Sequence, residues 1–136
     1  MAVERIVSSR LAPPNGHFSQ AVSAPLQGRI VFVSGMTARA PDGTVVGVGD
    51  IEAQTHQVCQ NIAEALMAAG GSMDDVARLD VYVRNIGDFE TIHRVRRQYF
   101  TGVPPASTMV EVSGFVHQDY LIEINAIAVV DQAKGE

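Results

Sequence analysis

The sequence predicts a single α+β domain, in which a mixed β-sheet carries two helices packed on one face. Two stretches, at residues 51–69 and 88–100, repeat apolar residues with helical spacing. Segments rich in β-branched residues precede, separate and follow these stretches, as expected of strands. The predicted order is therefore β-β-β-α-β-α-β-β. With 136 residues the chain is long enough for one hydrophobic core and too short for two, so residues 1–136 are expected to form one domain.

The first part of the chain contains strand and turn signals. Strands are expected at residues 17–22 and 29–34. In the second of these, β-branched and aromatic residues occupy successive positions, which predicts that both faces of the strand are buried. The sequence Pro41-Asp42-Gly43 supplies the residue types of a hairpin turn.

A long first helix is expected to run from residue 51 to about residue 69. Asp50 can cap it, because its carboxylate can accept a hydrogen bond from a free N–H group of the first turn. Gly70 and Gly71 can end it without steric penalty. Its apolar stripe comprises Ile51, Val58, Cys59, Ile62, Ala63 and Leu66.

The second half of the chain predicts a strand, a helix and two further strands. Residues 79–84 alternate apolar and polar side chains, and Asp88 can cap a helix that runs to about residue 100. Strands are expected at about 107–112 and 120–130. The sheet face away from the helices then mixes polar and apolar side chains, which is typical of subunits that meet around pockets. Its polar members are Asp80, Tyr82, Glu111, Glu123 and Asn125.

Composition excludes several classes of function. Hydrophobic residues make up 46% and charged residues 18%, and the net charge of -5 argues against nucleic-acid binding. With one cysteine, Cys59, and no signal peptide or membrane-spanning run, the protein is expected to be cytoplasmic and not membrane-bound. No metal or cofactor is expected, because the histidines lack metal-ligand spacing and Gly47-Val48-Gly49 lacks the third glycine of a dinucleotide loop.

Glu123 is the strongest candidate for chemistry. It lies in the apolar stretch L-I-E-I-N-A-I-A at residues 121–128, where burial of a carboxylate costs several kcal/mol unless something pairs with it. Strand alternation places Ile122 and Ile124 on one face and Glu123 on the other. Glu123 is therefore either a catalytic acid or base, or a structural carboxylate bonded to Arg78 or Arg84.

Four segments together resemble the Rid family (YjgF/RidA-like imine and enamine deaminases). They are H-F-S-Q-A-V at 17–22, V-F-V-S-G at 31–35, P-P-A-S-T-M-V-E-V at 104–112 and the stretch around Glu123. The resemblance covers about Ser19 to Val130. It implies a homotrimer with active sites between subunits and a small-molecule substrate. It also implies that Glu123 positions or activates the water that attacks an imine carbon.

One departure from the family concerns Ser107. The family usually reads P-A-R-S/T-x-V-E-V, so Ser107 stands where the resemblance implies an arginine that holds the substrate carboxylate. An arginine offers charge-assisted hydrogen bonds of about 1.5–3 kcal/mol each, whereas a serine offers one neutral donor. Either another cation substitutes, or the substrate is not a simple 2-imino acid. Alternatively, Ser107 merely fills a strand position and the pocket is idle.

Other pocket residues follow from the resemblance, each with a structural alternative. Phe18 matches a pocket tyrosine but could be ordinary core. Ser34 and Gly35 match a turn that holds substrate and water, although Gly35 could simply be a positive-φ residue at a strand end. His93 matches a position near the pocket but could lie on the surface. Substrate-binding roles are also expected for Thr108 and Met109, next to Ser107.

Three side chains could replace the missing cation: His93, Arg96 and His117. Arg96 lies three residues after His93 on nearly the same face of the second helix, and His117 lies in the loop before the Glu123 strand. From the sequence, Arg96 is expected to be a solvated residue of the helix, and His117 is expected to lie on the surface.

The sequence therefore predicts a Rid-type hydrolase or deaminase of a reactive imine or enamine in a specialised pathway. It predicts weak activity on simple 2-imino acids, because of Ser107. The alternative is a non-catalytic trimer that binds a small molecule or a partner protein. RNA cleavage, a third hypothesis, is disfavoured by the acidic balance of the chain.

Overall fold

The computed structural model describes residues 3–131. Its elements run in the predicted order β-β-β-α-β-α-β-β, although the residues of the first strands differ from those expected. The strands and helices are β1 (Glu4–Ile6), β2 (Ala21–Ser23), β3 (Arg29–Met36), α1 (Ile51–Ala68), β4 (Val76–Val83), α2 (Phe89–Tyr99), β5 (Ala106–Glu111) and β6 (Ile122–Val130), with 3-10 turns η1 (Met73–Asp75) and η2 (Ile86–Asp88). The sequence did not predict β1, and β2 covers only the end of the expected strand 17–22. The turn at Pro41 closes a single bridge between Arg39 and Val45.

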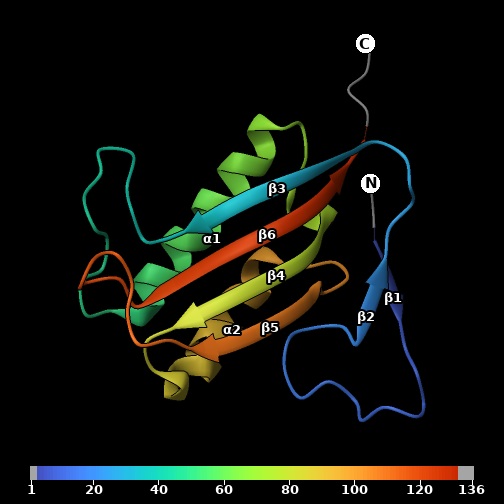
Figure 1. Ribbon diagram of the computed structural model, residues 1–136, viewed down its shortest axis with the longest axis horizontal. Coiled ribbons are helices and arrows are strands. Elements are labelled where there is room, and N and C mark those ends of the chain that lie inside the picture. The colour runs from blue at the N-terminus through green and yellow to red at the C-terminus, as the bar shows by residue number, and fades with distance from the viewer. Residues whose placement is uncertain (1–2, 132–136) are drawn as a thin grey trace.

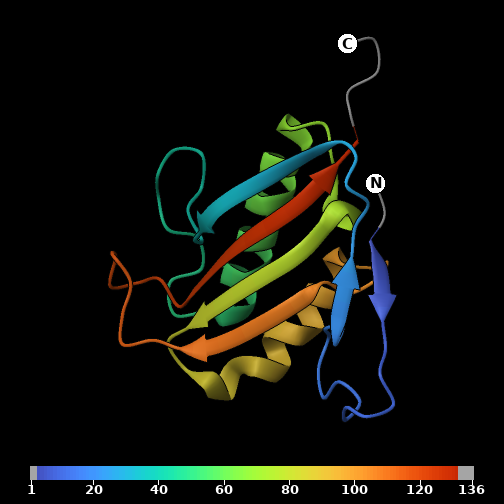
Figure 2. The same ribbon diagram turned by 45° about the vertical axis from the view of Figure 1, so that its right-hand side comes forward.

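The main sheet has four strands in the order β3-β6-β4-β5. β4 and β5 are parallel, and the other neighbouring pairs are antiparallel, so the sheet is mixed as predicted. Both helices lie on the same side of the sheet, and β1 and β2 form a separate ribbon beside the start of β5 (Figure 1, Figure 2). The α+β fold with two helices on one face is confirmed.

The hydrophobic core lies between the helices and the sheet. In β6, and in β4 from Leu79 onward, every second residue faces the helices and is buried, which is the alternation expected of strands with one covered face. Burial of each large aliphatic side chain contributes about 1.5–3 kcal/mol. The fully buried aliphatic residues include Val58, Ile62 and Leu66 from α1, Ile92 from α2, and Leu79, Val81, Ile122 and Ile124 from the sheet.

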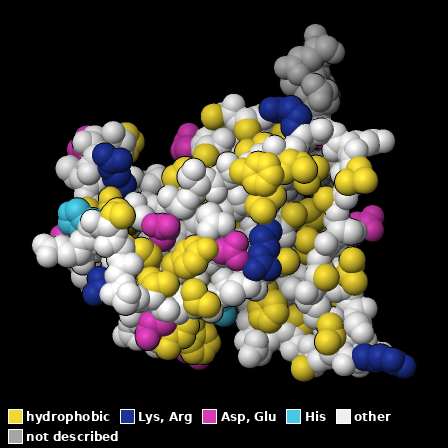
Figure 3. All heavy atoms as spheres, viewed as in Figure 1, with side chains coloured by type: hydrophobic (Ala, Val, Ile, Leu, Met, Phe, Trp, Pro, Cys, Tyr) yellow, Lys and Arg dark blue, Asp and Glu magenta, His cyan; other side chains and the backbone are white. Residues whose placement is uncertain are grey.

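The other side of the sheet, called here the uncovered face, has no layer over it. Ile30 and Phe32 on β3 are 60% and 74% exposed there, so the expectation that both faces of this strand are buried is wrong for the single chain. Hydrophobic side chains gather over β3 and β6 on this face, with charged side chains beside them over β4 (Figure 3). Such an exposed apolar patch indicates an interaction surface.

Gln54 joins two loops to the start of β6. Its fully buried side chain donates hydrogen bonds from Nε2 to the carbonyls of Gly47 (3.1 Å) and Asp119 (2.8 Å). Its Oε1 accepts a hydrogen bond from the N–H of Leu121 at 2.8 Å. These bonds hold the loop that precedes Glu123 against the beginning of α1.

Replacement of this amide is expected to destabilise the fold. Gln54→Leu leaves buried backbone groups without partners, so we expect the free energy of unfolding to fall by about 2–4 kcal/mol. Urea denaturation followed by circular dichroism measures it. Gln60→Leu, on the exposed side of the same helix, is the matched control and should change stability by less than about 0.5 kcal/mol. Equal losses in the two variants would contradict this role for Gln54.

Candidate functional site

A cavity of about 320 Å³ lies between α2, β5 and the loop that contains Phe18. We call it the β5–α2 cavity. In the parallel pairing of β4 and β5, Ser107 lies opposite Leu79 and Met109 opposite Val81, which directs both toward the helices. Four residues predicted from the sequence therefore meet here: Phe18, His93, Ser107 and Met109. Arg96, considered from the sequence as a substitute cation, also lines the cavity, together with three residues that the sequence did not point to: Asn15, Ile86 and Phe89.

Arg96 is buried in this cavity, with 1% of its surface exposed. The expectation of a solvated helix residue is therefore wrong. Its Nη2 donates hydrogen bonds to Ser107 Oγ at 3.1 Å and to the carbonyl of His17 at 3.4 Å. Ile92 and Phe100 lie four residues to either side, so Arg96 belongs to the apolar stripe of α2. The same spacing is present in the sequence, but an exposed side chain was expected because arginines are rarely buried.

The positive charge of Arg96 has no counter-charge among residues 3–131. Burial lowers the pKa of Arg96 to about 10, so the guanidinium remains protonated at neutral pH. Burial also raises the pKa of the nearby Cys59 thiol to about 12, which keeps that group neutral. No carboxylate of the described residues forms an ion pair with Arg96, and its buried Nε has no hydrogen-bond partner. The cavity therefore holds an uncompensated cation.

His93 lines the same cavity, and its imidazole is uncharged at neutral pH. Its pKa is lowered to about 4, first by burial and then by the positive charges of Arg96, Arg97 and His17. The ring meets Phe89 edge-on, with centroids 5.6 Å apart. A Cβ at Gly16 would lie 2.6 Å from the ring, so glycine makes room for it. His93 is thus a half-buried imidazole that does not add charge at neutral pH.

The low pKa of His93 predicts a pH dependence of stability. The folded state resists protonation of this ring, so the free energy of unfolding should fall as the pH drops from about 6.5 toward 4. His93→Gln removes the titrating group. We therefore expect wild type to lose stability relative to this variant between pH 7 and pH 4.5. Urea unfolding at both pH values measures the difference, and parallel losses in the two proteins would contradict the assignment.

Glu123 lies in a second depression, on the uncovered face. This sheet-face hollow has a volume of about 340 Å³ and is lined by Gly35, Tyr82, Val112, Gly114, Phe115, Glu123 and Asn125. Gly35 has no positive φ, so backbone strain does not explain the glycine. Instead, a Cβ at Gly35 would collide with Oε2 of Glu123. Gly35 thus provides the space in which the carboxylate lies.

Glu123 is not bonded to Arg78, which was one of the structural alternatives considered from the sequence. Nη2 of Arg78 donates to Asp80 Oδ1 at 2.8 Å and to Thr108 Oγ1 at 2.7 Å instead. Among the described residues, Glu123 has no hydrogen bond or ion pair, although it is half-buried. Its carboxylate is therefore available for a ligand or for water.

The remaining expected residues lie apart from these two sites. Thr108 faces the uncovered side with Arg78, outside the β5–α2 cavity. Ser34 is an exposed strand residue that lines neither the cavity nor the hollow. His117 is exposed, and its Nδ1 accepts a hydrogen bond from the N–H of Asp119 in the same loop. These three residues are not part of either site in the single chain.

The two sites lie on opposite sides of the sheet. Ser107 faces the helices, whereas Glu123 lies beside Tyr82 on the uncovered face. One chain therefore does not bring Glu123 together with Ser107, Met109 and the rest of the β5–α2 cavity.

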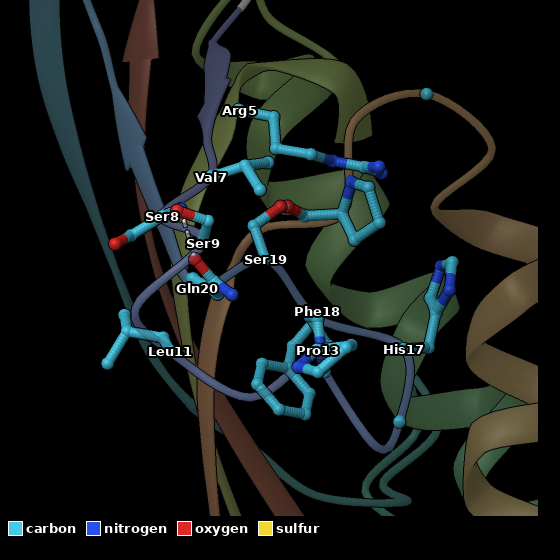
Figure 4. Close-up of a pocket in the computed structure, with 14 residues that line it drawn as sticks. Arg5, Val7, Ser8, Ser9, Leu11, Pro13, His17, Phe18, Ser19 and Gln20 are labelled. Atoms are coloured by element: carbon cyan, nitrogen blue, oxygen red, sulfur yellow. Dashed lines mark hydrogen bonds between the residues drawn. The ribbon is translucent and has the colours of Figure 1, made fainter.

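A third and larger cavity, of about 670 Å³, lies under the N-terminal segment. In Figure 4, Ser8, Ser9 and Gln20 form one part of its wall and Phe18 and Pro13 lie at one end. The N–H of Ser8 donates to Gln20 Oε1 at 2.7 Å, which fastens the two segments together. Phe18 separates this cavity from the β5–α2 cavity, because it lines both. It is therefore a cavity wall and is not part of the hydrophobic core.

The fold and these sites define a small α+β domain with a cavity and a hollow on opposite sides of one sheet. The family model described as endoribonuclease L-PSP matches residues 9–130. A RutC family protein of Pyrococcus abyssi is 38% identical over 128 residues, which cover 94% of this chain and 98% of that protein. The 3-aminoacrylate deaminase RutC of Acinetobacter baylyi is 37% identical over 128 residues, with the same coverage of 94% and 98%.

A solved structure agrees with these relatives. YyfB of Yersinia pestis, described as a member of the conserved Rid protein family, superposes with a TM-score of 0.87 at 33% identity. The match covers 96% of this chain and 100% of that one. The chain belongs to the Rid family, which confirms the resemblance seen in the sequence.

No helix within residues 3–131 combines the length and the apolar character needed to cross a membrane.

Proposed function

We propose that the protein is a hydrolase that releases ammonia from a reactive imine or enamine. The observation that carries this proposal is the carboxylate of Glu123, half-buried and unpaired, lying over Gly35 in the sheet-face hollow. A carboxylate in such a position can accept a proton from water at the moment of attack. The name of the relative from Acinetobacter baylyi, a 3-aminoacrylate deaminase, supports the same class of reaction.

The proposed reaction needs one water and no cofactor. The water oxygen attacks the imine carbon while Glu123 accepts a proton from that water, and the electrons of the C=N π bond go to nitrogen, which takes up a proton. The resulting carbinolamine loses its C–N bond: Glu123 returns its proton to nitrogen, the hydroxyl proton is released, and a carbonyl compound and ammonia leave. An enamine enters the same sequence after protonation at carbon converts it to the imine.

We also propose that three copies assemble so that the sheet-face hollow of one closes against the β5–α2 cavity of a neighbour. Two observations support this arrangement. Ile30 and Phe32 present an apolar surface on the face that carries Glu123. The cavity with Arg96 lies on the other side of the sheet and opens beside Ile86 and Phe89. A substrate between two subunits could then meet both groups.

A direct assay of ammonia release tests the reaction. Imines are generated in situ from amino acids by an amino-acid oxidase, and the rate of ammonia formation is compared with and without the protein. We expect acceleration above the spontaneous rate. Binding of the carbonyl product without acceleration would favour the alternative, a non-catalytic trimer that binds small molecules.

We do not propose RNA cleavage, although the description of the matching family model names an endoribonuclease. The arginine cluster on α2 does not form a basic surface. Arg96 is buried, and Arg94 is paired with Glu52 at 3.3 Å. Together with a net charge of -5, this gives little attraction for phosphates.

A further inference from the structure

We propose that Asn15 is a site of spontaneous deamidation, which replaces a neutral amide on the wall of the β5–α2 cavity with a carboxylate. The reaction needs water alone and does not depend on the proposed hydrolase. Asn15 lines this cavity and also a neighbouring depression of about 360 Å³. Its side chain is exposed and has no hydrogen bond to any of the described residues.

The chemistry follows from the residue that comes next. The backbone nitrogen of Gly16 loses its proton and attacks Cγ of Asn15. The new C–N bond closes a five-membered succinimide ring, and the side-chain nitrogen takes up a proton and leaves as ammonia. Water then adds to one of the two ring carbonyls, and the C–N bond at that carbonyl breaks. Opening at Cγ leaves an aspartate, whereas opening at the main-chain carbonyl leaves an isoaspartate, in which the main chain runs through the former side chain.

The first argument is the contrast between Asn15 and the other asparagines. Asn61 and Asn85 precede isoleucines and Asn125 precedes an alanine, so a Cβ crowds each attacking nitrogen. Hydrogen bonds of 2.9–3.1 Å also fix the side chains of these three residues. Within the described chain, Asn15 is the one asparagine that combines a following glycine, which has no Cβ, with a side chain free to rotate toward it.

The second argument is the freedom of the attacking nitrogen. The N–H of Gly16 has no acceptor among residues 3–131. The related pair Asp42-Gly43 differs in both partners. The N–H of Gly43 donates to the carbonyl of Ala40 at 2.8 Å. Hydrogen bonds from the backbone and the hydroxyl of Thr44 lower the pKa of Asp42, which keeps that side chain a carboxylate and a poor target for attack.

The third argument is that glycine is required at position 16. A Cβ there would lie 2.6 Å from Cε1 of His93, so a larger residue does not fit unless the ring moves. The close approach of His93 therefore preserves the glycine that makes Asn15 reactive.

The fourth argument is charge. Three arginines and one glutamate share these walls with Asn15: Arg94, Arg96, Arg97 and Glu90. Arg94 is paired with Glu52, whereas Arg96 and Arg97 have no ion pair in the described chain. A net positive charge therefore remains, which favours loss of the proton from the attacking nitrogen and stabilises the carboxylate that forms.

The modification changes both the charge and the covalent path of the loop that contains Phe18. A carboxylate at position 15 adds negative charge near His93, which lines the same cavity and the same depression. An isoaspartate also adds one methylene to the main chain just before Gly16, where the chain already lies against the ring of His93. The cavity is therefore expected to change as the protein ages.

Ageing of the full-length protein followed by peptide mapping tests the inference. Wild type is kept in neutral buffer at physiological temperature, digested with trypsin at intervals and analysed by mass spectrometry, with a sample from time zero to correct for changes during digestion. The peptide of residues 11–29, which contains Asn15 and no other asparagine, should gain about 1 Da and become a substrate of protein isoaspartyl methyltransferase. Fragment spectra should place the change at Asn15. Its conversion should be at least about tenfold faster than that of Asn61, Asn85 or Asn125.

Two variants complete the test. Asn15→Gln is the matched control, because a glutamine would have to close a six-membered ring, and its peptide should stay unchanged over the same period. Asn15→Asp introduces the charged product without ageing. Burial and nearby cations lower the pKa of His93 to about 4, and both Asn15→Asp and aged wild type should show a higher value by NMR titration.

Conversion of Asn15 no faster than that of the other three asparagines would overturn the inference. So would equal methylation of aged wild type and aged Asn15→Gln. A pKa of His93 that is the same in fresh wild type, aged wild type and Asn15→Asp would overturn the placement of the new charge on the cavity wall.

Discussion

Glu123→Gln is expected to lower the rate of ammonia release by about 10²- to 10⁴-fold. The amide keeps the size of the side chain and fills the same space over Gly35, but it cannot accept a proton from water. Thermal unfolding should remain close to that of wild type, because Glu123 makes no hydrogen bond or ion pair with the described residues. The measurement is a coupled ammonia assay on the in-situ imines, at matched protein concentration.

Glu64→Gln is the control for this variant. Glu64 is an exposed glutamate on α1, so the same chemical change should leave the rate within about twofold of wild type. If Glu123→Gln also retains the full rate, the carboxylate does not act in catalysis. The binding alternative would then be favoured for the sheet-face hollow.

Phe32→Asp is expected to separate the assembly into single chains and to abolish activity. The ring is 74% exposed in the single chain and belongs, with Ile30, to the apolar patch on the uncovered face. Burial of a phenylalanine contributes about 1.5–3 kcal/mol per copy, whereas burial of an unpaired carboxylate opposes association by several kcal/mol. Sedimentation velocity should report a trimer for wild type and a monomer for the variant.

Val48→Asp is the matched control, because Val48 is similarly exposed but lies in the loop before α1, away from the sheet. It should remain trimeric and active. A monomeric wild-type protein with full activity would refute the assembly, and with it the placement of the site between subunits.

The fold was largely predictable because its signals are local. The apolar stripe of α1, its cap at Asp50 and the alternation along β6 each depend on neighbours within one element. Asp50 does cap the helix, with its Oδ1 accepting from the N–H of Ala53 at 3.0 Å. The ribbon of β1 and β2 was missed or shortened because each strand has three residues, too few for a periodic pattern.

The site was only half predictable, for a different reason. Alternation within β6 showed that Glu123 faces away from Ile122, but it could not relate that face to the side of β5 on which Ser107 lies. That relation depends on the pairing of both strands with β4, which no local pattern encodes. Likewise, the burial of Arg96 depends on the short side chain of Ser107 across the cavity, eleven residues later in the chain.

The opposite facing of Glu123 and Arg96 has a genetic consequence for a closed ring of three copies. Each polypeptide would contribute the carboxylate of Glu123 to one active centre and the guanidinium of Arg96 to another. A copy that lacks both groups would then impair two centres, so its co-expression with wild type should lower activity more than the fraction of defective copies alone would. Conversely, a variant that lacks only Glu123 and a variant that lacks only Arg96 should restore some activity when they are co-expressed, because mixed trimers then contain some centres with both groups.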